Sequence, residues 1–286
     1  MKERSAPSPS IVVGIDGSRS AVDAALWAVD EAVIRDIPLR LLYAIEPRQP
    51  PSAGKAARDL ATAEIAVRTA YIAVESLEQP VKIEIEIVQD RAIHALVNAS
   101  RAATMLCVGG LGLERSTDRH YGSVAAAVSR SGHCPVAIIQ RHGPVRAAGG
   151  GWVVAQLDEW PDNSKVLEQS VREARLRRCA LRVLTRRHPR NAESSQAEKS
   201  TVAVKRTSAN LDKQLSWWRR RYPDLDIAKV PVDDNPTDYL ARNAGSIRLC
   251  VAGRRTGITA TEGAEAHKAL HDLKSSLLIC EGRSAL

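Results

Sequence analysis

The chain has 286 residues, of which 44% are hydrophobic and 26% charged; this is a globular composition and excludes a wholly disordered or fibrous chain. The length allows two modest domains, each with its own core. Aromatic residues make up only 3% and Phe is absent, so we expect cores of Val, Ile, Leu and Ala. Forty-one Lys and Arg against 33 Asp and Glu give a net charge of +8, which favours anionic partners without specifying them.

No apolar run reaches the ~18 residues that a membrane-spanning helix needs. The first ten residues are polar and rich in Pro and Ser, without the apolar core of a signal peptide. The five cysteines are scattered and form no C-x-x-C pair, so we expect buried, reduced thiols. These features predict a cytoplasmic protein without a membrane partner.

The first half of the chain predicts alternating strands and helices. An apolar run at 11–15 precedes a segment, 22–34, with the apolar spacing of a helix, and a second apolar run follows at 39–45. Such a unit implies parallel strands. The later predicted elements are a long helix with Leu60, Val67, Tyr71, Val74 and Leu77 on one stripe, strands at 81–88, 105–108 and 136–139, and helices at 92–102 and 123–131. Five strands alternating with four helices predict an open α/β sandwich.

The second half of the chain repeats the first. When the chain is shifted by 142 residues, EAVIRDIPLRLL at 31–42 falls on EARLRRCALRVL at 173–184, with six of twelve positions identical. Asp16 falls on Asp158 at the same shift. Several aligned blocks at nearly one offset indicate a duplication.

The segment between the two copies has the composition of a linker. It reads RHGPVRAAGGG at 141–151. We therefore expect two domains, 1–145 and 146–286, each an open α/β sandwich with a five-stranded, mainly parallel sheet. Their last strands, 136–139 and 277–280, lie at sheet edges and are expected to pair, so that the two halves form an intramolecular pseudo-dimer; a homodimer is a further expectation.

A glycine motif follows the fourth predicted strand. The strand runs into Gly109, Gly110, Leu111 and Gly112, and nine residues later Gly122 and Ser123 open a helix. Backbone N–H groups approach phosphate oxygens most closely where no Cβ intrudes, and a helix start presents unpaired N–H groups and the positive end of its dipole. The pattern predicts a phosphate site.

Asp16 ends the first predicted strand and should lie at the same edge of the sheet. A carboxylate there suits a ribose hydroxyl or a bound Mg²⁺. The alternative is a simple turn, in which Ser18 caps the next helix.

The segment IVVGIDGS together with the glycine motif resembles the universal stress protein family, in the tandem-domain form common in actinobacteria. The resemblance covers nearly all of 10–140 and, more faintly, 151–281. It implies a Rossmann-like, adenine-nucleotide alpha hydrolase-like fold and ATP as the ligand, with or without Mg²⁺. Carried over by position, it places Asp16 at the ribose and the backbone of Ala44 at the adenine. The full set of nucleotide-binding residues expected is Gly14, Asp16, Ala44, Gly109, Gly110, Leu111, Gly112, Arg119, Gly122, Ser123 and Val124.

The sequence departs from the family pattern in two places. The loop 113–121 is charged, and Arg119 is expected to reach a phosphate, although a solvated loop is the alternative. In the second half Gly253 and Gly257 have lost the spacing, and Glu265 stands where Gly122 stood in the first half. Because a carboxylate at a helix start repels phosphate, we expect the second site to be empty.

The function expected from these features is that of a nucleotide-binding regulator in the stress or dormancy response, with a regulatory protein partner that the sequence does not name. No nucleophile is paired with a base, so no catalytic residue is expected and hydrolysis of ATP would at most be slow. A basic scaffold or nucleic-acid-associated protein is the alternative. The Trp- and Arg-rich run 217–222 is interpreted as a structural helix end rather than a nucleic-acid surface, so no nucleic acid is expected as a partner.

Overall fold

The protein forms two compact units, which are described separately. In the computed structural model the first unit comprises Met1–Arg141 with Ser276–Ile279, and the second comprises His142–Ser275 with Cys280–Leu286. The structure describes residues 9–47, 53–110, 122–140, 151–157, 163–186, 195–232, 236–254 and 275–280.

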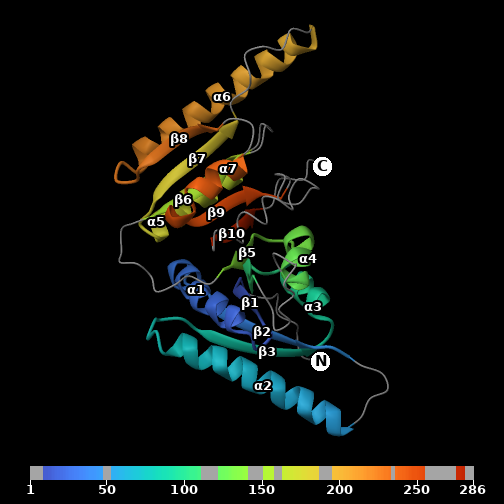
Figure 1. The fold of residues 1–286 in the computed structure, drawn as a ribbon. Helices are drawn as coiled ribbons and strands as arrows, with labels where there is room; N and C mark the ends of the chain where they lie inside the picture. Colours follow the sequence, from blue (N-terminus) through green and yellow to red (C-terminus); the bar gives the residue numbers. More distant parts are fainter. Residues whose placement is uncertain are drawn as a thin grey trace. The chain divides into compact units, whose positions relative to one another are not determined.

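The sheet of the first unit is mostly parallel (Figure 1). Its strands are β1 (Ile11–Ile15), β2 (Leu39–Ile45), β3 (Ile83–Gln89), β4 (Met105–Gly109), β5 (Val136–Ile139) and the last strand of the chain, β10 (Ser276–Cys280). The order is β3-β2-β1-β4-β5-β10, and the first five run parallel to their neighbours. β10 is antiparallel to β5, with Leu277 opposite Ile138. The unit thus contains a strand contributed from near the end of the chain.

Four helices cover this sheet in two layers. They are α1 (Arg19–Arg35), α2 (Ala53–Glu75), α3 (Ala92–Ala99) and α4 (Ser123–Ser131). α1 packs on β1 and β4 and against α2, while α3 and α4 pack against each other (Figure 1). The open α/β sandwich predicted from the sequence is confirmed, and the apolar runs of β1 and β4 are buried, as strands covered on both faces require.

The stripe predicted on the long helix is buried only in the second half of α2. Val67 and Val74 are buried, but Leu60 and Leu77 are 45% and 42% exposed. α2 has 23 residues and is ~34 Å long, whereas the seven-residue strand β2 beneath it spans ~23 Å. The first turns of the helix, which include Leu60, therefore extend beyond the strand, while Leu77 follows the end of the helix.

The second unit repeats the strand order of the first. Its strands are β6 (Trp152–Gln156), β7 (Ala180–Arg186), β8 (Ile227–Val232) and β9 (Ile247–Gly253), and its helices are α5 (Ser164–Leu176), α6 (Ser195–Arg221), α7 (Pro236–Arg242) and the short 3₁₀ helix Ala244–Ser246. The parallel order β9-β6-β7-β8 matches β4-β1-β2-β3 of the first unit. The sequence repeat is thus also a repeat of topology.

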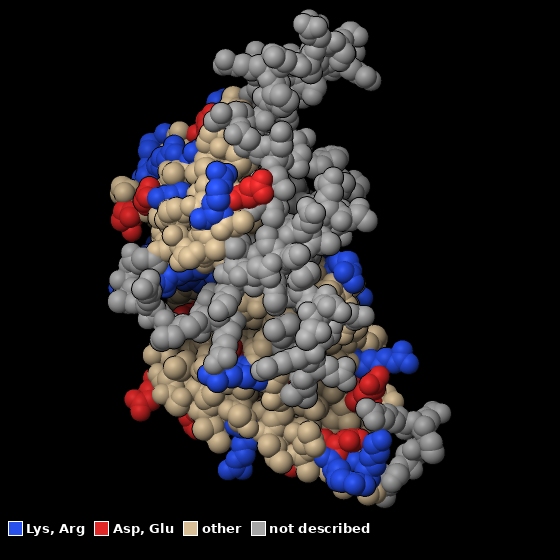
Figure 2. All heavy atoms as spheres, viewed as in Figure 1, with Lys and Arg blue, Asp and Glu red and all other residues tan. Residues whose placement is uncertain are grey.

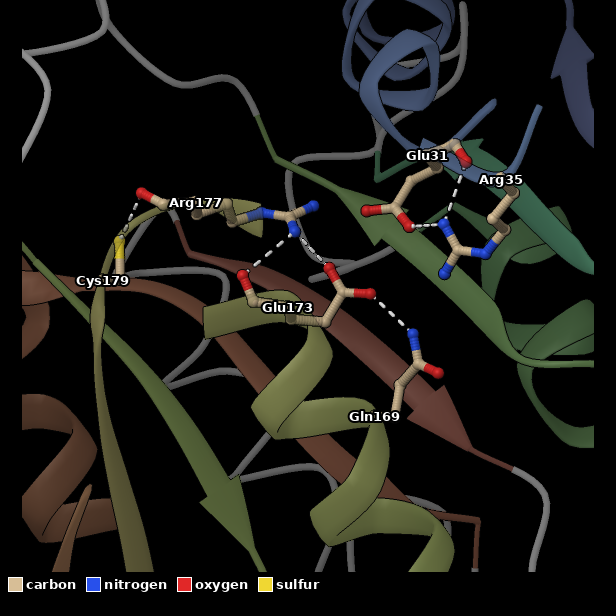
Figure 3. Close-up of polar contacts among 6 residues, drawn as sticks. All are labelled: Glu31, Arg35, Gln169, Glu173, Arg177 and Cys179. Atoms are coloured by element: carbon tan, nitrogen blue, oxygen red, sulfur yellow. Dashed lines mark hydrogen bonds and ion pairs between the residues drawn. The ribbon is translucent and has the colours of Figure 1, made fainter. Parts of the chain in front are cut away.

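An ion pair recurs at the same place in each repeat. Glu31 pairs with Arg35 on α1, and Glu173 pairs with Arg177 at the end of α5 (Figure 3). Each residue of the second pair comes 142 residues after its counterpart, and Arg177 is the first residue beyond α5. Both glutamate side chains are fully buried. Glu173 also accepts a hydrogen bond of 2.6 Å from the amide of Gln169. Each ion pair joins two residues one turn apart on a helix that packs on the sheet of its own unit.

The cysteines have the state that the sequence predicts. All five cysteines are free and buried, as predicted. Within the described ranges, no helix is both long and apolar enough to cross a membrane.

Candidate functional site

The turn after β1 is built by its own side chains. Gly17 has a φ of +85°, which glycine adopts without strain. The N–H of Ser18 donates to Oδ1 of Asp16 at 2.9 Å, and Oγ of Ser18 accepts from the N–H of Ala21 at 3.1 Å. The capped turn considered as an alternative is therefore present. It uses one carboxylate oxygen of Asp16, and a carboxylate has two.

Asp16 lies next to a tyrosine that the sequence analysis did not single out. Tyr43 on β2 is in register with Ile15 of β1. Burial raises the pKa of Tyr43, and the negative charges of Asp16 and of Asp59 on α2 raise it further. Tyr43 is thus close enough to both carboxylates for their charges to act on its phenol. The one signal in the sequence was that Tyr43 directly precedes Ala44, the residue assigned to the adenine.

Gly109 allows the end of β4 to approach the first turn of α1. A Cβ at this position would lie 2.7 Å from the carbonyl carbon and 2.4 Å from Oγ of Ser20. No side chain larger than hydrogen fits there without moving the helix. The glycine therefore has a packing reason in addition to the phosphate role expected from the sequence.

Gly110 connects β4 to the start of α4. Its N–H donates to the carbonyl of Ile139 in β5 at 2.9 Å, and its own carbonyl accepts from the N–H of Gly122 at 2.9 Å. The two ends of the glycine motif are thus held together by the backbone, although eleven residues separate them in sequence.

The N-terminus of α4 is open to an anion. Its N-cap is Gly122, so no side-chain oxygen caps the first turn, and that turn contains no acidic residue. By contrast, α1 is capped by Ser18. The unpaired N–H groups and the positive dipole end of α4 therefore remain for a ligand. Ser123, the first residue of the helix, is exposed at this point.

Several of the expected residues have other surroundings or lie outside the described residues. A Cβ on Gly14 would lie 3.1 Å from Leu96 of α3, so Gly14 permits close packing of that helix on β1. Ala44 is half-buried on β2, and Val124 lies in the first turn of α4. The residues outside the described ranges are Leu111, Gly112, Arg119, Asp158, Gly257 and Glu265.

What the structure brings together is a row of groups at the carboxyl edge of two neighbouring strands, β1 and β4. Asp16 follows β1, Gly109 ends β4 and is followed by Gly110, and the start of α4 is bonded to Gly110. In an open α/β sheet this edge is where ligands bind.

Comparison with known proteins identifies the family. The model of the universal stress protein family matches residues 8–140. A universal stress protein of Mycobacterium tuberculosis is 42% identical over 275 residues, which cover 95% of each chain. A second from the same organism is 42% identical over 246 residues, covering 86% of this chain and 88% of the relative. The chain belongs to the universal stress protein family.

Solved structures show the same fold over almost the whole length of this universal stress protein. A universal stress protein from Archaeoglobus fulgidus superposes with a TM-score of 0.70 at 13% identity, covering 96% of this chain and 97% of that one. A protein of unknown function from Pseudomonas aeruginosa gives a TM-score of 0.58 at 18% identity, with coverage of 96% and 92%. The fold of this chain, over both of its units, is thus found in these two solved structures.

Part of the Trp- and Arg-rich run of this universal stress protein packs at the end of α6, whereas Trp217 is 51% exposed. Trp218 stacks on Tyr222, whose ring also lies 3.9 Å beneath the guanidinium of Arg175. Arg219 donates to the carbonyl of Ile227. On the face shown in Figure 2, Lys and Arg side chains are interspersed with Asp and Glu. These contacts favour the structural interpretation of the run.

Proposed function

We propose that this universal stress protein binds one adenine nucleotide, ATP, in its first unit and acts through it as a regulator in the stress or dormancy response. The observation that carries the proposal is the start of α4. It is uncapped, free of acidic residues, and bonded through Gly122 to the glycine end of β4. A phosphate group would satisfy N–H donors that no side chain of the first turn caps.

The remaining roles follow from the row of groups at the sheet edge. Asp16 would accept hydrogen bonds from the ribose through the oxygen not used in its turn, and the backbone of Ala44 would meet the adenine. The glycines at 109, 112 and 122 and Ser123 would surround the phosphates. The described residues contain no cluster of three potential metal ligands, so a Mg²⁺ ion would depend mainly on the phosphates.

The second half, 146–286, is proposed as a domain without a nucleotide of its own, because its sequence places Glu265 where the first half has Gly122. We assign no catalytic residue. Nucleotide binding would change the surface of the protein, and a regulatory partner would recognise this changed surface.

Calorimetric titration with ATP, and mass spectrometry of small molecules released from the denatured protein, test this proposal. We expect one site per chain, with affinity reduced about tenfold in Asp16→Ala, since a lost charged hydrogen bond contributes ~1.5–3 kcal/mol. Asp158→Ala, at the equivalent position of the second half, is the matched control and should bind as the wild type does. Two equivalent sites, or equal affinities of Asp16→Ala and wild type, would refute the proposal.

A further inference from the structure

A buried side-chain amide lies next to the proposed phosphate site. Its nitrogen makes no hydrogen bond within the described chain. Gln140 follows β5 directly and is only 7% exposed. Its Nε2 has no hydrogen-bond partner among the residues that the structure describes. Buried polar groups in folded proteins are nearly always paired, so an unpaired donor in such a place points to a missing ligand.

The amide of Gln140 is directed at Gly110. A methyl group on Gly110 would lie 2.8 Å from Nε2 and 2.9 Å from Cδ of Gln140, so the amide occupies the space that the glycine leaves open. The carbonyl of Gly110 accepts the N–H of Gly122, the N-cap of α4. Gly110 therefore lies between the unpaired donor of Gln140 and the uncapped start of α4.

Hydrogen bonds at the end of β5 hold the backbone of Gln140 in place. Its backbone N–H donates to Oγ of Ser276 in β10 at 3.3 Å, and the preceding residue, Ile139, accepts from the N–H of Gly110. These bonds hold the backbone on both sides, and burial restricts the side chain, so the amide can serve as a preorganised donor whose ordering is completed on folding.

The strand order places Gln140 beyond the glycines as seen from Asp16. The order is β1-β4-β5, so the strand that carries Gln140 lies two strand spacings, ~10 Å, from the strand that ends in Asp16. A nucleotide with its ribose at Asp16 and its first phosphate over β4 would direct further phosphates toward β5.

We propose that Gln140 is a further phosphate-binding residue, whose Nε2 donates to the distal phosphates and makes the first unit prefer ATP to AMP. The inference rests on the proposed function, and it assigns the selectivity of that site to one side chain. The amide gains its partner only when a long phosphate chain is present, so the burial that is unfavourable in the free protein becomes favourable in the complex.

Titration of Gln140→Leu in the full chain with ATP and with AMP tests the inference. We expect the Kd for ATP to rise about tenfold and that for AMP to change by less than about twofold. Because leucine keeps the buried volume and removes the unpaired amide, the melting temperature should stay the same or rise. Gln156→Leu, at the end of β6, is the control, since its Oε1 is likewise buried without a partner in the described chain. It should leave both affinities unchanged.

Each other outcome overturns the inference in a recognisable way. If Gln140→Leu weakens the binding of ATP and of AMP equally, or weakens neither, the amide does not contact the distal phosphates. The proposal that the first unit binds a nucleotide is unaffected by that result. If the variant only loses stability, Gln140 has a packing role. If the wild type binds neither nucleotide, the proposed function fails and this inference fails with it.

Discussion

At the scale of single residues, small side chains decide which groups reach the candidate site. Gly109 and Gly14 are glycines because α1 and α3 approach the sheet closely at these points. The same absence of a Cβ that admits a helix on one side leaves backbone N–H groups accessible on the other. Packing and binding therefore require the same residue, and a loss of nucleotide affinity in Gly109→Ala alone would not separate the two roles.

From the buried thiols of Cys250 and Cys280 we predict how the stability of the protein depends on pH. Burial raises the pKa of Cys250 and of Cys280 from 9.0 to about 12. In the unfolded chain these thiols ionise near 9, so between about pH 9 and about 12 the unfolded state has released protons that the folded state still holds. The free energy of unfolding should therefore be unaffected by these groups below pH 9 and fall as the pH rises above it.

Denaturant unfolding at a series of alkaline pH values measures this effect. The double variant Cys250→Ala/Cys280→Ala should show a shallower fall with pH than the wild type, although its stability at neutral pH is lower because two buried side chains are truncated. Parallel curves for the two proteins would contradict the prediction. So would rapid labelling of these thiols in the folded protein near neutral pH, since the reactive species is the thiolate.

At the scale of elements, the helices differ in how their ends are satisfied. α1 is closed at its start by Ser18, and its C-cap residue, Asp36, adopts a left-handed conformation and donates its N–H to the carbonyls of Ala32 and Val33. α4 begins at a glycine. The N-terminus of α1 is thus capped by a side chain of its own chain, whereas the N-termini of α4 and of α3 lack such a cap. What distinguishes α4 is the backbone hydrogen bond from its N-cap, Gly122, to Gly110 at the end of β4, and the proposed function rests on this arrangement.

Removing one partner of the repeated ion pair on α1 and α5 should destabilise the protein, because the remaining charge stays buried. In Glu31→Ala, the guanidinium of Arg35, only 11% exposed, loses its carboxylate partner. Breaking a buried pair costs ~3–5 kcal/mol, and we expect a loss of that order in the free energy of unfolding of Glu31→Ala and of Glu173→Ala.

The matched control for this prediction is Glu168→Ala on α5. Glu168 and Arg172 have the same i, i+4 spacing but are 60% and 48% exposed and 3.9 Å apart. Because solvent screens exposed pairs, its loss should be under ~0.5 kcal/mol. Equal losses in Glu31→Ala and Glu168→Ala, measured by urea unfolding, would show that burial is not what gives the pair its effect.

At the scale of the whole molecule, the last strand is the main departure from a simple linear repeat. Residues 276–279 belong to the first compact unit, where β10 runs antiparallel to β5 and covers the edge that β5 would otherwise expose. An uncovered strand edge is a template for pairing with another chain.

A fragment of residues 1–145 lacks β10 and should therefore self-associate through the exposed edge of β5, while the full chain should not associate through that edge. Analytical ultracentrifugation over a range of concentrations measures this. The fragment should still bind ATP if the site proposed above is complete within it, but Gln140 loses its bond to Ser276 in the fragment. A fragment that stays monomeric at high concentration would contradict the edge-pairing argument.

The sequence by itself determined the elements and the repeat. Hydrophobic periodicity placed the strands 39–45 and 136–139 and the helix 123–131 at the bounds that the structure shows. The third helix ends at Ala99 rather than at 102; its C-cap residue is Ser100, whose Oγ donates to the carbonyl of Val97. Motif spacing also placed Asp16 and the glycines at one edge of the sheet, because the carboxyl ends of parallel strands share that edge.

Only the tertiary structure decided which groups face one another. The position of Tyr43 beside Asp16, the contact of Gly109 with Ser20 and the unpaired amide of Gln140 against Gly110 depend on strand register and helix packing. Local patterns carry no information on contacts between residues that are far apart in the sequence. The physical reason is that such contacts are set by how whole elements pack, and a one-residue change of register would replace every one of them.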